Sequence, residues 1–234
     1  MDILKKVEEY RAKQESLQWE GTFKEYLKLL EDRPYLAQSA HSRIYEMIIE
    51  KGVGEENGMK QYNFFKDSLF GLEEALEKLV EEYFHPAAKR LDVKKRILLL
   101  MGPVSGGKST LVTLLKRGLE EYSLTNRGAV FAIKGCPMHE NPLHLIPQHL
   151  REDFENEYGI KIEGSLSPLN RMRLEEEYHG KIEDVLVERI FFSEDNRVGI
   201  GTFSPSDPKS QDIADLTGSI DFSTIATYGS ESDP

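Results

Sequence analysis

The stretch ILLLMGPVSGGKSTLVTLL, residues 97–115, decides the fold. Five apolar residues run straight into a loop that contains one proline and three glycines, and apolar residues then return at helical spacing. A short apolar run bounded by glycine and proline is typical of a buried strand. We therefore predict a strand over 97–101, a glycine-rich loop and a helix that begins near Ser109.

The loop matches the phosphate-binding pattern G-x-x-x-x-G-K-[ST], in the strand–loop–helix context that this pattern requires. Its glycines let backbone N–H groups point at phosphate oxygens, and the free N–H groups at the start of the helix add to that positive field. The residues expected to contact a nucleotide are Gly102, Pro103, Val104, Ser105, Gly106, Gly107, Lys108, Ser109 and Thr110.

Phosphate-loop chemistry assigns a role to the last three of these residues. Lys108 would reach the β- and γ-phosphates and is the expected catalytic residue, while Ser109 would supply an oxygen ligand to Mg²⁺. Thr110 would contact the α-phosphate. The N-K-x-D motif with which G proteins read guanine is not found in the sequence, so ATP with Mg²⁺ is expected rather than GTP.

Composition narrows the choice of partners and compartment. A net charge of −11 makes broad attraction to nucleic acid or to an anionic membrane unfavourable, so neither is expected as a partner. The single cysteine, Cys136, cannot form an intramolecular disulfide, which fits a reducing compartment. The opening MDILKKVEEY lacks the apolar core of a secretory signal, and no apolar run approaches the length of a membrane span. We therefore expect a cytoplasmic protein.

Residues 1–60 are expected to form a small helical segment, and residues 61–234 the ATP-binding domain. In the first part, TFKE predicts a capping box, in which the Thr22 hydroxyl accepts a backbone N–H and Glu25 reaches back. In the second, leucines at helical spacing predict a helix over 69–91, which Pro86 should kink or end. Further elements are expected at 129–133 (a buried strand), 147–159 and 167–180 (helices, the second capped by Ser167) and 188–203 (two strands around a four-residue turn).

The phosphate loop and the preceding LFGLEEALEKLVEEYF resemble the opening of an AAA+ module, in which a helix and a short apolar-glycine element help to hold adenine. Leu69, Phe70 and Gly71 fall where that element is expected. More narrowly, three blocks are similar to the PrkA-type serine protein kinases of bacteria: HPAAKRLDVKKRILLLMGPVSGGKSTLV, KGCPMHENPLHLIP and GTFSPSDPKSQDIADLTGSIDFS. This resemblance runs from about Trp19 to the last residue.

The resemblance implies an α/β fold of the P-loop NTPase class, AAA+-like, with a parallel sheet. It also implies an ATP-dependent serine/threonine protein kinase, a transferase that acts on a protein substrate and forms a homo-oligomer at full length. An ATP-dependent protease or remodelling module is the competing assignment for the family. The H-R-D and D-F-G motifs of ordinary protein kinases are not found, so kinase activity rests on the resemblance alone.

A phosphate-loop NTPase also needs an acid after a second buried strand, the Walker B acid. Glu194 or Asp195 in RIFFSED is the best match, but EDNR is typical of a hairpin turn. Asp221 is weaker, because only one apolar residue directly precedes it. Only 125 residues follow Ser109, whereas a full core needs about four more strands with crossovers of roughly 30 residues each. We therefore expect an N-terminal fragment with an incomplete sheet.

Other interpretations stay open. A small-molecule P-loop kinase would fit the length, but such enzymes usually begin near their loop, and about 95 residues precede this one. A nucleotide-binding fragment without turnover would fit the missing acid. A zinc site would use Cys136, His139, His144 and His149, but their spacings match no common zinc pattern. A loop that contacts a neighbouring subunit or a substrate is the preferred interpretation of that segment.

Overall fold

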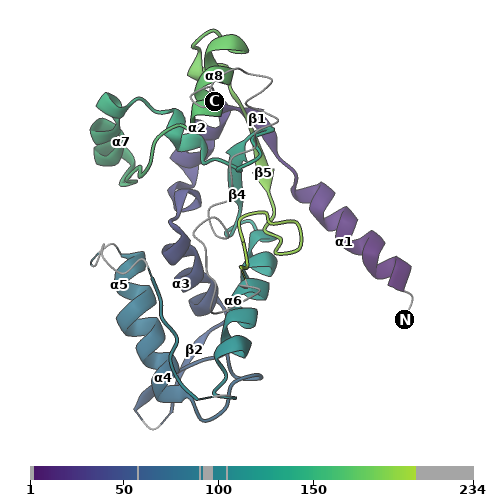
Figure 1. The fold of residues 1–234 in the computed structure, drawn as a ribbon, viewed down its shortest axis with the longest axis vertical. Coiled ribbons are helices and arrows are strands. Elements are labelled where there is room, and N and C mark those ends of the chain that lie inside the picture. The colour runs from purple at the N-terminus through teal and green to yellow at the C-terminus, as the bar shows by residue number, and fades with distance from the viewer. Residues whose placement is uncertain (1–2, 57, 90, 92–96, 104, 204–234) are drawn as a thin grey trace, which may run out of the picture.

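The computed structural model describes residues 3–56, 58–89, 91, 97–103 and 105–203. Over these residues the molecule is elongated, with a small antiparallel sheet in its upper half and a group of helices in its lower half (Figure 1). One helix, α1, projects away from the body (Figure 1).

The α-helices of the described residues are α1 (Ile3–Leu17), α2 (Phe23–Asp32), α3 (Ala40–Glu50), α4 (Glu73–Lys78), α5 (His85–Ala88), α6 (Lys108–Ser123), α7 (Arg151–Tyr158) and α8 (Pro168–Glu176). A π-helix (Leu79–Phe84) joins α4 to α5, and short 3-10 helices lie at Pro34–Ala37, Pro142–Leu145, Gln148–Leu150 and Ile182–Asp184. No described helix is both long and apolar enough to cross a bilayer.

Local signals set the starts of two helices as predicted. At α2 the capping box is confirmed: the Thr22 hydroxyl accepts a hydrogen bond from the Glu25 N–H at 3.3 Å, and the Glu25 carboxylate accepts one from the Thr22 N–H at 2.7 Å. At α8 the Ser167 hydroxyl accepts from the Asn170 N–H at 3.3 Å. Each cap satisfies a backbone donor that the first helical turn leaves free.

Pro86 was expected to kink or end its helix, and the structure shows that it does not end it. The chain widens into the π-helix just before Pro86 and continues as α5 to Ala88. Proline lacks an N–H, and its ring meets the carbonyl of the residue four positions earlier in a regular α-helix. We infer that the wider turn accommodates the ring while the helix keeps its direction.

Two antiparallel sheets are described. The larger has the order β1 (Glu20–Thr22), β5 (Leu186–Ile190), β4 (Val130–Ile133), with Val187 opposite Gly21 on one side and Ile133 on the other. The smaller pairs β2 (Val53–Glu56) with β3 (Met59–Tyr62). The buried strand expected at 129–133 is confirmed as β4. Of the two strands expected over 188–203, the structure keeps the end of β5, the turn at 194–197 and isolated bridges from Ser193 to Val198 and Gly199.

The parallel sheet expected around residues 97–101 is wrong for the described part of the chain. These residues form no strand there, and Ile97, Leu99 and Met101 are 75–87% exposed. Leu98 and Leu100 alternate with them and pack on the lower core. One face of this apolar segment is therefore covered and the other is not, because both described sheets form elsewhere.

Two hydrophobic clusters form the core. The upper one packs Phe23 and Leu30 of α2 against Phe131 of β4 and Val187 of β5. The lower one gathers side chains of α3, β3, α4, the π-helix and α6. The upper cluster thus draws on residues from both sides of position 60, and the division of the chain at that position stays a prediction.

Replacing Thr22 with Ala removes the cap of α2, whose apolar face lies in the upper cluster. We expect the free energy of unfolding to fall by about 1 kcal/mol, while Thr22→Ser, which keeps the hydroxyl, retains most of it. Urea unfolding at pH 7 measures both variants. Equal stability of Thr22→Ala and the unchanged chain would contradict this role of the cap.

Candidate functional site

The glycine-rich loop turns directly into α6, as the sequence predicted. Gly107 is the N-cap of α6 with a left-handed backbone (φ 75°), and the Gly106 N–H closes a turn on the Pro103 carbonyl at 3.2 Å. Gly107 has no side chain that could accept from the first turn of the helix. The N–H groups of that turn therefore remain available to an anion, at the positive end of a 16-residue helix.

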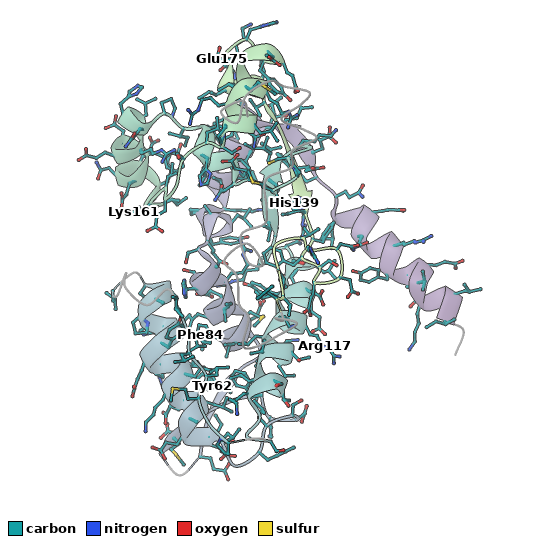
Figure 2. All side chains as sticks on the ribbon, viewed as in Figure 1. Tyr62, Phe84, Arg117, His139, Lys161 and Glu175 are labelled. Atoms are coloured by element: carbon teal, nitrogen blue, oxygen red, sulfur yellow. The ribbon has the colours of Figure 1, made fainter. Side chains whose placement is uncertain are left out.

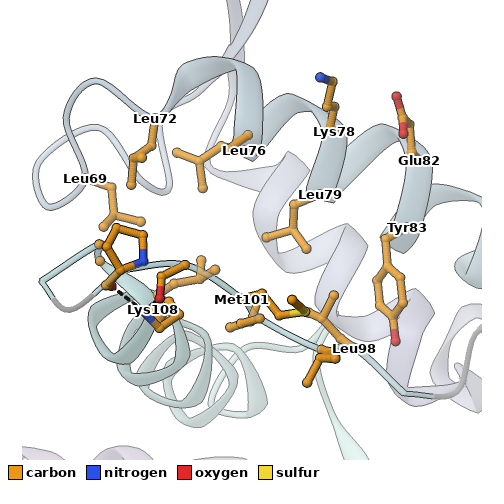
Figure 3. Close-up of a pocket in the computed structure, with 18 residues that line it drawn as sticks. Leu69, Leu72, Leu76, Lys78, Leu79, Glu82, Tyr83, Leu98, Met101 and Lys108 are labelled. Atoms are coloured by element: carbon orange, nitrogen blue, oxygen red, sulfur yellow. Dashed lines mark hydrogen bonds between the residues drawn. The ribbon is translucent and has the colours of Figure 1, made fainter.

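The Lys108 ammonium lies inside this loop. It donates hydrogen bonds to the carbonyl oxygens of Gly102, at 2.8 Å, and Pro103, at 2.6 Å (dashed in Figure 3). Two of its three donors are thus held by the loop itself. This arrangement fixes the charge next to the backbone groups that an anion would meet.

The structure places the other loop residues as follows. Ser109 and Thr110 lie exposed in the first turn of α6. Val104 lies outside the described residues. The loop thus presents an ammonium, backbone N–H groups and a serine hydroxyl at one helix terminus. This donor set suits phosphate oxygens and a hard cation bound to them.

A cavity of about 640 Å³ adjoins the loop, between the α4–π helix on one side and residues 98–103 on the other (Figure 3). Leucine is the commonest residue in its walls, which also include Lys78 and Glu82; Lys108 lies toward one end and Tyr83 toward the other (Figure 3). Its size falls within the range of small-molecule sites. An apolar cavity next to a phosphate-type loop can hold a ligand that has one flat apolar part and one anionic part.

The element expected to hold adenine is only partly in place. Leu69 is buried and lines the cavity, where its side chain lies against Gly107. Phe70 is 76% exposed and does not line this cavity. Gly71 takes a left-handed backbone (φ 71°) that turns the chain toward α4.

The Walker B candidates do not join this site. Glu194 accepts hydrogen bonds from the Lys116 ammonium and the Thr202 hydroxyl, and the bond from Lys116 lowers the pKa of its carboxyl. Lys116 lies seven residues beyond Ser109 on α6, roughly 10 Å along the helix axis. Asp195 is exposed in the turn. The turn therefore braces α6, and Asp221 lies outside the described residues.

The segment weighed as a zinc site is organised around a carboxylate that the sequence analysis missed. Glu140 is 8% exposed and accepts hydrogen bonds from the Ser167 hydroxyl (2.6 Å), the Asn170 amide (2.5 Å) and His144 Nδ1 (3.0 Å). Asn170 also donates to the Cys136 sulfur at 3.1 Å. These bonds dock the start of α8 on the loop. The only local signal was an acid among prolines and apolar residues.

The four proposed zinc ligands do not converge. Cys136 is buried against Asn170, while the second ring nitrogen of His144 lies 2.9 Å from the Glu163 carbonyl. His149 is exposed. Within the part of the chain that the structure describes, no cluster of three or more metal-ligating side chains is present.

Gly107→Ala tests the loop conformation. An added Cβ would lie 3.2 Å from methyl groups of Leu69 and Leu72, which can shift, so the left-handed backbone carries most of the cost. We expect a loss of roughly 1–2 kcal/mol in the free energy of unfolding. Gly54→Ala, where nothing lies within 4 Å of the added atom, is the control and should be nearly neutral. Similar losses in both variants would count against a strained loop.

Glu140 predicts a dependence of stability on pH. Burial raises the pKa of its carboxyl, but the bonds from Ser167, Asn170 and His144 outweigh burial and hold it below the ordinary 4.5. A lowered folded-state pKa means that the network stabilises the fold above pH 4.5 and loses this contribution as pH falls through the folded-state value.

We expect Glu140→Gln to cost about 2 kcal/mol at pH 7, because one acceptor oxygen becomes a donor. Its loss of stability from pH 6 to pH 3.5 should be smaller than that of the unchanged chain. Urea midpoints across this range measure the difference, with the exposed Glu152→Gln on α7 as control. Parallel pH profiles for Glu140→Gln and the unchanged chain would refute this assignment.

Two relatives found by comparison with known proteins are much longer than this chain. The chain is 76% identical over all its 234 residues to the "ATP-dependent protease PrkA" of Bacillus subtilis (strain 168), of which it covers 37%. It is 33% identical over 175 residues to the "Serine/threonine kinase YeaG" of Escherichia coli (strain K12), covering 72% of this chain and 26% of that protein. The chain thus spans well under half the length of these relatives.

A shorter relative matches as well. The "Uncharacterized protein in gldA 5'region" of Geobacillus stearothermophilus is 65% identical over 97 residues, which are 42% of this chain and all of that protein. No solved structure matches the chain. The model of the family described as "PrkA AAA domain" matches residues 21–234. The chain therefore belongs to the PrkA AAA domain family.

Proposed function

We propose that this chain is the ATP-binding module of a PrkA-type serine/threonine protein kinase and binds ATP with Mg²⁺ through residues 102–110. The observation that carries the proposal is the Lys108 ammonium, held within the glycine loop where α6 begins. Family membership adds support, because AAA domains are nucleotide-binding modules. A cytoplasmic location, a protein substrate and a homo-oligomer at full length belong to the same proposal.

Two parts of the site would bind different parts of the ligand: the loop with the first turn of α6 would bind the phosphates, and the adjoining cavity would bind the base. Backbone N–H groups of the loop and of the first turn of α6 would bind phosphate oxygens, and Lys108 would exchange its two carbonyl partners for them. The Ser109 hydroxyl would hold Mg²⁺, and the leucine-lined cavity would take the base. When bound, Mg²⁺-ATP supplies an activated γ-phosphoryl group.

The names of the relatives leave two activities for the full-length protein. One relative is named a protease and the other a serine/threonine kinase. ATP binding is common to both, so the proposal for residues 102–110 holds under either name. Kinase activity is the first choice here, and ATP-dependent proteolysis or remodelling is the alternative.

Binding without turnover is a second candidate function for the 234-residue chain itself. It is favoured by Glu194, the best Walker B match, whose carboxylate is engaged by Lys116 and Thr202. An acid tied to the middle of α6 is not free to position a water molecule at the helix start. We therefore expect this chain to bind nucleotide and to hydrolyse little of it.

Lys108→Ala tests the proposal directly. Loss of charge-assisted bonds to phosphate should weaken Mg²⁺-ATP binding by about 100-fold, as measured by isothermal titration calorimetry. Arg117→Ala is the matched control, because it removes one positive charge from the exposed side of the same helix (Figure 2). Phosphate release should be near background for all three proteins.

Three outcomes would contradict parts of this proposal. Failure of the unchanged chain to bind Mg²⁺-ATP would overturn the binding role of the loop. Equal weakening by both substitutions would indicate a general charge effect. Turnover that Lys108→Ala abolishes would overturn the second candidate function and make Glu194 and Asp195 the acids to replace next.

A further inference from the structure

Helix α1 is long, projects from the body and is left largely uncovered by the described residues. It spans Ile3–Leu17 and stands away from the body of the molecule, with side chains around its whole circumference (Figures 1 and 2). Residues 3–12 are all exposed, including Ile3 at 69%, Val7 at 42% and Tyr10 at 50%. A helix of this length is marginal in water alone, and helices in proteins gain most of their stability by packing an apolar face.

Four large apolar side chains of α1, together with Gln14, follow a heptad repeat. Ile3, Val7, Tyr10, Gln14 and Leu17 are spaced by four, three, four and three residues. At 100° per residue they fall within an arc of roughly 80°. Leu4, which is 67% exposed, lies beside this arc at a flanking heptad position, on the same side as Arg11. Alternating spacings of four and three residues are typical of a two-helix coiled coil, in which the flanking positions also contact the partner helix.

Charge is segregated around this seam, which we call the α1 seam (Ile3, Val7, Tyr10, Gln14 and Leu17). Lys6 borders it on one side and Arg11 on the other, at the two heptad positions that flank a coiled-coil interface. The acids of α1 lie on the opposite arc: Glu8, Glu9 and Glu15. A partner that covers the seam would therefore meet positive charge on both of its edges.

This distribution argues against a second copy as the partner. In a parallel pair of α1 helices, Lys6 of one copy would face Arg11 of the other, because flanking positions five residues apart meet across the interface. Like charges opposed in this way are destabilising. Acidic side chains at the same positions of a different helix would instead form two ion pairs.

We propose that α1 is a docking helix for another protein, and that its partner is an amphipathic helix with an apolar heptad seam flanked by Asp or Glu. Docking buries the α1 seam and pairs Lys6 and Arg11 with acids. The surface lies on a different element from the phosphate loop, so the proposal is independent of nucleotide binding.

Two synthetic helical peptides of about 28 residues test the proposal. They share a Leu/Ile seam and differ only at the flanking positions, which carry Glu in one peptide and Lys in the other. Fluorescence anisotropy with the 234-residue chain gives the affinity for each. We expect the Glu-flanked peptide to bind at least about tenfold more tightly, with the preference shrinking as salt rises.

Adjacent lysines provide a matched pair of variants. Lys6→Glu and Lys5→Glu make the same charge change, but Lys6 borders the seam and Lys5 lies on the far arc. Lys6→Glu should weaken binding of the Glu-flanked peptide by about fivefold, and Lys5→Glu should leave it nearly unchanged. Val7→Asp, which places a charge in the seam, should abolish binding, and circular dichroism checks that the fold is kept.

Several results would overturn the proposal. Equal affinity for both peptides, equal effects of the two lysine variants, or binding to neither peptide would each do so. Sedimentation that shows a dimer of the chain, lost in Val7→Asp, would assign the seam to a second copy instead. Binding to phosphatidylglycerol vesicles that Val7→Asp abolishes, without peptide binding, would assign it to a membrane.

Discussion

A single helix, α6, carries the phosphate loop at its start and is fixed to the antiparallel sheet at its end. The buried hydroxyl of Ser123 accepts the Phe192 N–H at 3.1 Å, and the Ser123 carbonyl accepts the Arg189 guanidinium at 2.9 Å. About two helical turns earlier, the Lys116 ammonium donates a hydrogen bond to the Glu194 carboxylate. Sliding α6 along its axis would break these bonds and leave buried polar atoms unpaired. The position of the loop therefore depends on the sheet that lies at the far end of the helix.

The features that could be predicted from the sequence are those whose causes lie within a few residues. The Thr22–Glu25 box and the Ser167 cap join groups three residues apart, and the glycines of the loop determine its backbone locally. Strand β4 could be predicted from its own apolar run, and its Phe131 and Ile133 side chains lie in the upper cluster. In each case the sequence contains the donor, the acceptor and the spacing together.

The features that could not be predicted depend on residues that are distant in the sequence. Residues 97–101 have the composition of a central strand, but a strand also needs neighbours, and the described sheets form from other segments. Glu194 follows an apolar run as a Walker B acid would, yet Lys116, 78 residues earlier, determines its place. Glu140 is buried because Ser167 and Asn170 arrive from 27 and 30 residues away. A single sequence shows which groups can pair, but not which of them meet.

At the proposed phosphate site, the loop's own hydrogen bonds would limit its affinity for an anion. Lys108 already donates to two carbonyls, so an anion that takes their place gains only the difference between the new bonds and the old ones. That difference is favourable, because the present acceptors are neutral carbonyls, whereas a phosphate oxygen adds the attraction between opposite charges. The loop also pays little conformational entropy, since Gly107 and the first turn of α6 are already in place. A loop that holds its own lysine can therefore discriminate strongly between an anionic ligand and a neutral one.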